Sequence, residues 1–188
     1  MRVIMMGPPG VGKGTQATIL ARDLGVPAIS TGELFRAHVA DGTELGRRLR
    51  SLVEAGEYVP DEVTNTLVAE RLDEPDAHEG FILDGYPRTL AQVDELERML
   101  RERGAELSCV VMLSADPEVV LSRLHTRAAD QGRADDDPEV VRTRIAVYER
   151  ETAPLEQVYT ERGLLVRIDG SATPEEVAER IIAACRPE

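Results

Sequence analysis

Lysine is almost absent from this chain. Of its 22 basic residues one is a lysine, Lys13, and all the others are arginines. A lysine ammonium is a compact point charge, whereas the arginine guanidinium is a planar fork, so the two are not interchangeable where a cation must fit between phosphate oxygens. The retention of lysine at this one position predicts a specific role for Lys13 in anion binding.

Cysteines and long apolar runs are also scarce. The two cysteines, Cys109 and Cys185, are isolated and form no C-x-x-C pair, which predicts two reduced thiols in or near the core. No apolar stretch approaches the roughly 18 residues of a membrane span, and the segment before Gly7 is too short for a secretory signal. We therefore expect a cytoplasmic protein without a membrane partner.

Positive charge is in short supply, because the formal net charge is −13 at pH 7. A nucleic-acid partner requires a basic face, so this charge argues against one. An acidic protein that binds a smaller polyanion must gather its few cations in one place. The length of 188 residues fits one domain with a real hydrophobic core.

Five apolar, mostly β-branched runs predict the strands of a sheet. They cover Val3–Met6, Val26–Ser30, Gly80–Asp84, Ser108–Leu113 and Leu164–Ile168. Because segments with helical spacing separate these runs, we expect an α/β fold with a five-stranded, mainly parallel sheet flanked by helices. Helices are expected over 14–23, 88–103 and 117–127, from Pro138 through 148–155, and from a cap at Thr173 onward.

Two segments interrupt this alternation. About 50 residues separate the second and third strands, too many for one crossover, and breaks at Asp41-Gly42-Thr43 and Ala55-Gly56 predict three short helices in a semi-independent lobe. The segment Ala128–Asp137, AADQGRADDD, has a glycine, no apolar anchor and four aspartates. It is either a solvated surface loop or a mobile lid, and its composition alone favours the loop.

The stretch GPPGVGKGT, Gly7–Thr15, joins the first strand to the first helix. It fits the phosphate-loop pattern G-x-x-x-x-G-K-[ST] as far as Lys13, but Gly14 stands where a hydroxyl is expected, and the hydroxyl follows at Thr15. In such a loop backbone N–H groups converge on phosphate oxygens, and glycines let the backbone approach closely. Lys13 is then predicted to contact the β- and γ-phosphates of a nucleotide.

A second motif, GFILDGYPR over residues 80–88, ends an apolar strand in Asp84. A carboxylate at the end of a neighbouring strand is typical of a group that orients magnesium beside a phosphate loop. An aspartate that merely ends a strand is the alternative. The glycine, proline and Arg88 that follow directly favour the functional interpretation.

Together these motifs resemble those of adenylate kinases. The resemblance runs from Arg2 to about Ile182, and it rests on GPPGVGKGTQ, STGELFR over 30–36, LDGYPR over 83–88, GRADD over 132–136, Arg142-Thr143-Arg144, and Tyr148-x-x-x-Thr152-x-Pro154-Leu155. It also explains Gly14, because the loop of that family resembles G-x-P-G-x-G-K-G-T. Magnesium is then held mainly by nucleotide phosphates and waters, with Asp84 in its outer shell.

The resemblance implies a P-loop nucleoside-phosphate kinase fold with two mobile inserts. One insert, residues 30–59, would close over AMP, and a short lid, residues 126–136, would close over ATP; the core would be 1–29, 60–125 and 137–188. The implied reaction is reversible, magnesium-dependent transfer of the γ-phosphoryl group of ATP to AMP, giving two ADP. These nucleotides are the expected partners, and a monomer is the expected state.

The same resemblance assigns the site residues. Those implied to act on the transferring group are Lys13, Asp84, Arg88, Arg133 and Arg144. Those implied to bind ATP are Gly10, Val11, Gly12, Lys13, Gly14, Thr15, Arg123, Arg127 and Ala172. Those implied to bind AMP are Thr31, Arg36, Glu57, Tyr58, Val59, Gly85, Arg88, Gln92, Arg133 and Arg144. Asp135 and Asp136 are implied to orient lid arginines, and helical spacing allows only one of Arg142 and Arg144 to point inward.

Three alternatives differ in substrate or activity. A uridylate/cytidylate kinase shares the fold and the short lid, but Thr31 and Gln92 favour AMP, since an amide can pair with an acceptor and a donor on the edge of adenine. A GTP-binding switch relies on an N-K-x-D motif, and the single lysine is already used at Lys13. A nucleotide-binding protein without catalysis would not need Asp84, Arg88 or the lid arginines. The lid has no cysteine cluster, so we expect no zinc.

Overall fold

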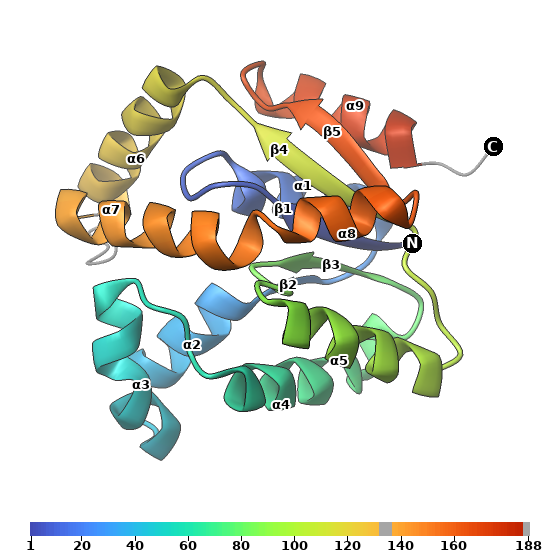
Figure 1. Cartoon of the computed structure of the whole chain (residues 1–188), viewed down its shortest axis with the longest axis horizontal. Helices are drawn as coiled ribbons and strands as arrows, with labels where there is room; N and C mark the ends of the chain where they lie inside the picture. The colour runs from blue at the N-terminus through green and yellow to red at the C-terminus, as the bar shows by residue number, and fades with distance from the viewer. Residues whose placement is uncertain (132–136, 186–188) are drawn as a thin grey trace.

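The computed structural model describes residues 1–131 and 137–185, and of residues 125 and 127–131 the backbone alone. Its centre is a parallel sheet with the strand order β2-β3-β1-β4-β5 (Figure 1). The strands are β1 (Arg2–Met6), β2 (Ala28–Ser30), β3 (Phe81–Asp84), β4 (Cys109–Ser114) and β5 (Leu165–Asp169). The predicted five-stranded parallel sheet is thus confirmed.

Helices alternate with these strands along the chain. The helices up to β3 are α1 (Lys13–Leu24), α2 (Thr31–Ala40), α3 (Glu44–Ala55) and α4 (Asp61–Leu72), followed by a 3₁₀ turn (Pro75–Ala77). The later ones are α5 (Leu90–Glu102), α6 (Pro117–Gln131), α7 (Pro138–Val147), a π-helical segment (Tyr148–Thr152), α8 (Leu155–Glu161) and α9 (Pro174–Cys185). None of the helices within these described residues is long and apolar enough to cross a membrane.

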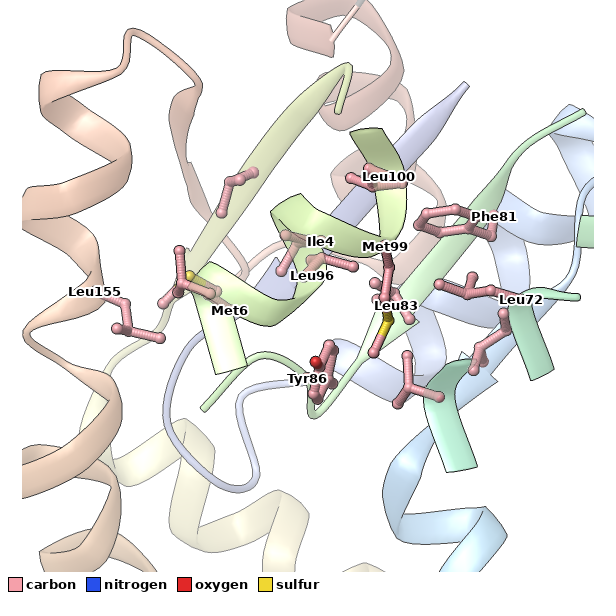
Figure 2. Close-up of a cluster of buried hydrophobic side chains, with 14 of the residues drawn as sticks. Ile4, Met6, Leu72, Phe81, Leu83, Tyr86, Leu96, Met99, Leu100 and Leu155 are labelled. Atoms are coloured by element: carbon pink, nitrogen blue, oxygen red, sulfur yellow. The ribbon is translucent and has the colours of Figure 1, made fainter. Parts of the chain in front are cut away.

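Side chains of the strands alternate between two hydrophobic layers, as the period of two requires. Ile4 and Met6 face α4, α5 and α8, where they join Leu96 and Leu155 (Figure 2). Val3 and Met5, which alternate with them in β1, face α1 and α9 on the other side of the sheet. Because both faces are covered by helices, the strands are continuous apolar runs, and this is why they could be predicted.

A third, smaller hydrophobic cluster is centred on Phe35, Leu49 and Val59. It belongs to α2, α3 and the segment that leads into α4, which lie to one side of the sheet (Figure 1). Helices α2 and α3 approach so closely that a Cβ atom at Gly46 would lie 1.9 Å from the carbonyl oxygen of His38. A separate core agrees with the predicted semi-independent lobe and its three helices.

Helix α6 is longer than the sequence predicts. The expected end is near Arg127, but the helix continues to Gln131. The residues that follow Arg127 begin with two alanines, the best helix formers, and the next helix-breaking glycine comes after Gln131. The prediction of a surface loop over 128–137 is therefore wrong for residues 128–131, which are helical. The lid over 126–136 stays a prediction, and residues 132–136 lie outside the described part of the chain.

The predicted long helix from Pro138 through 148–155 is divided in two. Helix α7 ends at Val147, and in the π-helical segment that follows, the backbone N–H of Ala153 donates to the carbonyl oxygen of Tyr148, five residues earlier, at 2.9 Å. Pro154 has no N–H and cannot continue the α-helical ladder. The chain therefore changes register here before α8 begins at Leu155.

The two cysteines form a disulfide that joins β4 to the end of α9. Cys109 and Cys185 have Cα atoms 5.7 Å apart. Both side chains are buried, as predicted, but the prediction that they are reduced thiols is wrong. Because they are 76 positions apart, only the packing of α9 on the sheet brings them together, and no local spacing in the sequence signals that contact.

Candidate active site

A cavity of about 660 Å³ lies where the strands end. Its walls include Met6, Ser30 and Asp84, the last residues of β1, β2 and β3. At this point β1 lies between β3 and β4, so the strand order reverses, and ligands of open α/β sheets bind at such a switch point. The volume is in the range of small-molecule sites.

Residues 7–12 form the loop that leads from β1 into α1 and lines this cavity. The loop requires glycine, because Gly10 and Gly12 have φ angles of 84° and 108°, which residues with a Cβ rarely adopt. Lys13, the first residue of α1, donates from Nζ to the carbonyl oxygens of Gly7 and Pro8 at 2.8 and 2.9 Å. Its ammonium is thus held against the loop, where the N-terminus of α1 adds partial positive charge.

Arg123 joins two loops on one side of the cavity. Extending from α6, its guanidinium donates to the carbonyl oxygen of Val11 at 3.0 Å and to that of Gly170 at 2.9 Å. Val11 belongs to the phosphate loop, and Gly170 to the loop after β5 that also brings Ala172 to the cavity wall. A single side chain therefore fixes the distance between these two loops.

Arg88 is held on the opposite side, in the segment between β3 and α5. Its Nε donates to the carbonyl oxygen of Gly85 at 2.7 Å, and its backbone N–H donates to Oε1 of Gln92 at 2.7 Å. The guanidinium carbon lies 4.7 Å from the centre of the Tyr58 ring, a cation–π arrangement. The side chain is thus oriented before any ligand enters.

Two further arginines reach the cavity from the flanking segments. Arg36 comes from α2 and Arg144 from α7. The side chain of Arg144 packs against the end of α3: a Cβ atom, if Gly56 had one, would lie only 2.6 Å from the Cγ of Arg144. Arg142 is exposed and does not line the cavity. The structure therefore turns Arg144 inward and Arg142 outward. Their spacing predicted that only one would point inward, and the family resemblance selected Arg144.

The described wall of the cavity has an excess of positive charge. Five cations and two carboxylates line it: Lys13, Arg36, Arg88, Arg123 and Arg144, with Glu33 and Asp84. In a chain with a net charge of −13, this is the local gathering of cations that a polyanion site requires. Tyr148 also lines the cavity, and burial raises its pKa to about 12, so its hydroxyl remains protonated at neutral pH.

Comparison with known proteins accounts for this arrangement. The model of the adenylate kinase family matches residues 5–164, most of the chain and most of the cavity wall. The chain belongs to the adenylate kinase family. The adenylate kinase of Clavibacter michiganensis subsp. michiganensis is 57% identical over 97% of this chain and 92% of its own length. Those of Kocuria rhizophila and a Nocardioides species are each 52% identical, over 97% and 98% of this chain and 97% and 96% of their own lengths.

An adenylate kinase uses ATP together with Mg²⁺, and the residues beside the phosphate loop fit that ion. Asp84 lies close to Gly14: a Cβ atom on that glycine would be 3.5 Å from Oδ2 of Asp84. Thr15 lines the same cavity. Magnesium prefers oxygen ligands and keeps several waters, so one carboxylate beside the phosphates suffices. Among the described residues, no three His, Cys, Asp or Glu side chains group to hold a metal ion directly.

Two residues predicted to recognise AMP are more deeply buried than their role suggests. Thr31 and Gln92 are 1% and 2% exposed, and neither lines the cavity. Thr31 donates to the carbonyl oxygen of Gly85 at 2.9 Å, and Gln92 donates to Asp61 at 2.6 Å while it accepts from Arg88. An amide can form four hydrogen bonds, so Gln92 keeps capacity for a base. Contact of either residue with adenine stays a prediction.

The remaining residues of the implied adenylate kinase site are placed as follows. Glu57 is exposed, Tyr58 lies against Arg88, and Val59 is buried in the small hydrophobic cluster. Arg127 belongs to α6, but its side chain is outside the described part of the chain. Arg133, Asp135 and Asp136 also lie outside the described residues.

Three residues support the site through contacts that the sequence does not indicate. Gln16 donates to the carbonyl oxygen of Pro174 at 2.9 Å, and Asp61 accepts hydrogen bonds from Thr89 and Gln92. Thr152 donates to the carbonyl oxygen of Arg88 at 2.9 Å. Gln16 and Thr152 were part of the quoted family patterns, yet the sequence gives no sign of their partners, which lie 158 and 64 residues away.

Proposed function

We propose that this chain catalyses the reversible transfer of the γ-phosphoryl group of ATP to AMP, giving two molecules of ADP. The observation that carries the proposal is the gathering of five cations on one cavity beside a phosphate loop, in a chain of the adenylate kinase family. Two nucleotides together bring many negative charges. An acidic protein can hold them side by side only where its cations are concentrated.

The two sides of the cavity divide the substrates between them. We assign ATP to the side of the phosphate loop, with Lys13 at its phosphates and Arg123 and Ala172 near its adenine. We assign AMP to the side of Arg36 and Arg88, with Thr31 and Gln92 behind. The strand order supports this division: β1, which leads into the phosphate loop, lies between β3, which precedes Arg88, and β4, which precedes the helix of Arg123. The transferring phosphoryl group must lie between donor and acceptor.

Catalysis in this proposal is positioning and charge neutralisation. The acceptor is a phosphate oxygen of AMP, which is largely ionised at neutral pH because the second pKa of a phosphate monoester is about 6. No side chain therefore has to remove a proton or form a covalent intermediate. Lys13, Arg88 and Arg144 hold the phosphates in line and offset their charge, with Arg133 added from the lid. Bound Mg²⁺, with Asp84 in its outer shell, supplies further neutralisation of the phosphates.

Closure of the two inserts completes the site. We propose that residues 30–59 close over AMP and residues 126–136 close over ATP, which excludes water from the transferring group. The separate hydrophobic cluster around Phe35 supports movement of the first insert as one unit. We further propose a cytoplasmic monomer that acts on free nucleotides, without a nucleic-acid or membrane partner and without zinc.

Substitution of the single lysine tests the proposal. We expect the wild type to form ADP from ATP, AMP and Mg²⁺, and Lys13→Met to do so at least 100-fold more slowly, because it removes a cation from the phosphates. The melting temperature should stay close to the wild-type value, since this side chain belongs to none of the hydrophobic clusters. Arg22→Met, on an exposed part of the same helix, is the matched control with unchanged turnover. Near-normal turnover of Lys13→Met would contradict the assignment, and an inactive wild type would contradict the function.

A further inference from the structure

Thr152 is a buried hydroxyl whose hydrogen bonds, like that of Thr31, leave its own helical segment. Its side chain is 5% exposed, and Oγ1 donates to the carbonyl oxygen of Arg88 at 2.9 Å. Threonines in helices commonly donate to the carbonyl four residues earlier. Thr18, Thr66, Thr126, Thr143 and Thr160 all do so here. Thr152 instead reaches a residue 64 positions away, and this residue lines the active-site cavity.

The same hydroxyl is 2.7 Å from the hydroxyl of Tyr58. A threonine hydroxyl has one hydrogen, and that of Thr152 is donated to Arg88. Tyr58 is therefore the donor of the second bond, and Thr152 accepts it. The two hydroxyls form a chain of hydrogen bonds from Tyr58 through Thr152 to the backbone of Arg88.

Tyr58 thus contacts Arg88 at both ends of that residue. Its ring lies 4.7 Å from the guanidinium carbon, while its hydroxyl reaches the Arg88 carbonyl through Thr152. The carbonyl bond fixes the backbone from which the side chain extends, and the ring limits where the guanidinium can turn. We call Tyr58 and Thr152 together the Arg88 clamp.

The clamp joins parts of the chain that belong to different segments of the site. Tyr58 follows α3 at the end of the 30–59 insert, whereas Thr152 ends the π-helical segment after α7. Close packing permits the contact, because a Cβ at Gly56 would lie 2.6 Å from Arg144 and 2.8 Å from Val140 of α7. The π-helical turn is itself a feature that often marks functional sites. The clamp can therefore form only while the end of the insert rests on α7.

We propose that Thr152 is a positioning residue: with Tyr58 it holds the Arg88 guanidinium in the orientation that binds the phosphate of the acceptor nucleotide, and only when the insert lies against α7. The inference rests on the proposed phosphotransfer to AMP and adds a residue to its machinery. Thr152 also lines the cavity, but its hydroxyl is engaged with the Arg88 carbonyl oxygen and the Tyr58 hydroxyl, so its role is to position Arg88. Its removal should therefore affect the acceptor and leave the donor site intact.

Steady-state kinetics of Thr152→Val test the clamp, because valine keeps the shape and removes the hydroxyl. We expect kcat/KM for AMP to fall about tenfold or more, since the Arg88 carbonyl and the Tyr58 hydroxyl lose their partner, while KM for ATP stays within twofold. Thr152→Ser keeps a hydroxyl and should retain at least a third of the wild-type kcat/KM. Thr160→Val, which removes an ordinary bond to the carbonyl of Glu156, is the matched control and should match the wild type.

A second variant makes the test independent of the folding of the first. Tyr58→Phe keeps the ring on Arg88 and should lower kcat/KM for AMP about threefold. The Tyr58 hydroxyl acts only through Thr152. The kcat/KM for AMP of the double variant Tyr58→Phe/Thr152→Val should therefore be within twofold of that of Thr152→Val alone. The proposal would be overturned if the losses in kcat/KM of the two single variants multiplied in the double variant, or if Thr152→Val lowered kcat/KM equally for AMP and ATP. It would also be overturned if Thr152→Val had the kcat/KM for AMP of an active wild type. An inactive wild type would instead overturn the proposed function on which it rests.

Discussion

At the scale of the residue, Arg123 offers the sharpest test of how the cavity is divided. Its guanidinium holds the carbonyl oxygens of Val11 and Gly170 together, and both loops lie on the side assigned to ATP. Arg123→Ala should therefore raise KM for ATP about tenfold or more and leave KM for AMP within twofold. Initial-rate kinetics with each substrate varied in turn measure this split. The exposed Arg150→Ala is the control, and an equal rise for both substrates would show that the division is wrong.

The sequence indicates candidate site residues but not the contacts that hold them. Lys13 was singled out because it is the only lysine. The spacing of Arg142 and Arg144 predicted that only one of them points inward, and the family resemblance selected Arg144. The predicted contact of Thr31 and Gln92 with AMP stays a prediction, and their bonds to Gly85 and Asp61 depend on packing between distant segments. Thr152 ends the π-helical segment, and no residue pattern predicts that segment or the bond from Thr152 to the Arg88 carbonyl oxygen.

At the scale of the element, the disulfide between β4 and α9 contributes to stability through the length of chain that it closes. A cross-link across 76 residues restricts the unfolded chain and should add about 2–4 kcal/mol to the free energy of unfolding. Thermal unfolding of the protein with a strong reductant should therefore show a melting temperature lower by roughly 4–16 °C. Activity at 25 °C should change little, because the cavity lies at the other end of the strands.

Two controls distinguish the cross-link from other effects of the reductant. Cys109→Ala/Cys185→Ala has no disulfide, so its melting temperature should not respond to the reductant. Alkylation of the unfolded protein should label neither cysteine before reduction and both after it. Two thiols labelled without any reductant would contradict the disulfide and restore the expectation drawn from sequence.

Elements were predictable where one physical signal dominated. The five strands were found because both faces of the sheet are covered, which makes each strand an unbroken apolar run. The end of α6 was predicted too early because its last turn has no apolar residue that would indicate packing. Helix propensity alone favoured a helix there, while the aspartates of the same segment are typical of a loop. The start of α9 was found from its cap: Thr173 donates from its backbone N–H and hydroxyl to Glu176, and these bonds hold the pKa of that carboxyl below its usual value.

At the scale of the whole molecule, the arrangement of charge explains how an acidic chain can bind polyanions. The strand order puts the phosphate loop at the centre of the sheet, and the segments after β3 and around α2, α6 and α7 bring arginines toward it from several sides. Net charge alone argues against such a ligand. The sequence predicts that cations must gather in one place. The fold shows that this place is the cavity at the carboxyl ends of the strands, where Lys13 and the four arginines meet.

The central claim is that this site transfers a phosphoryl group from ATP to AMP. The most direct test is the initial rate of ADP formation from ATP and Mg²⁺ with AMP, UMP, CMP and GMP supplied in parallel as acceptors. The account predicts that AMP is preferred at least tenfold over each of the others. Faster turnover of UMP or CMP would keep the fold and the phosphate loop but contradict the acceptor, and the absence of turnover with all four would contradict the catalytic function itself.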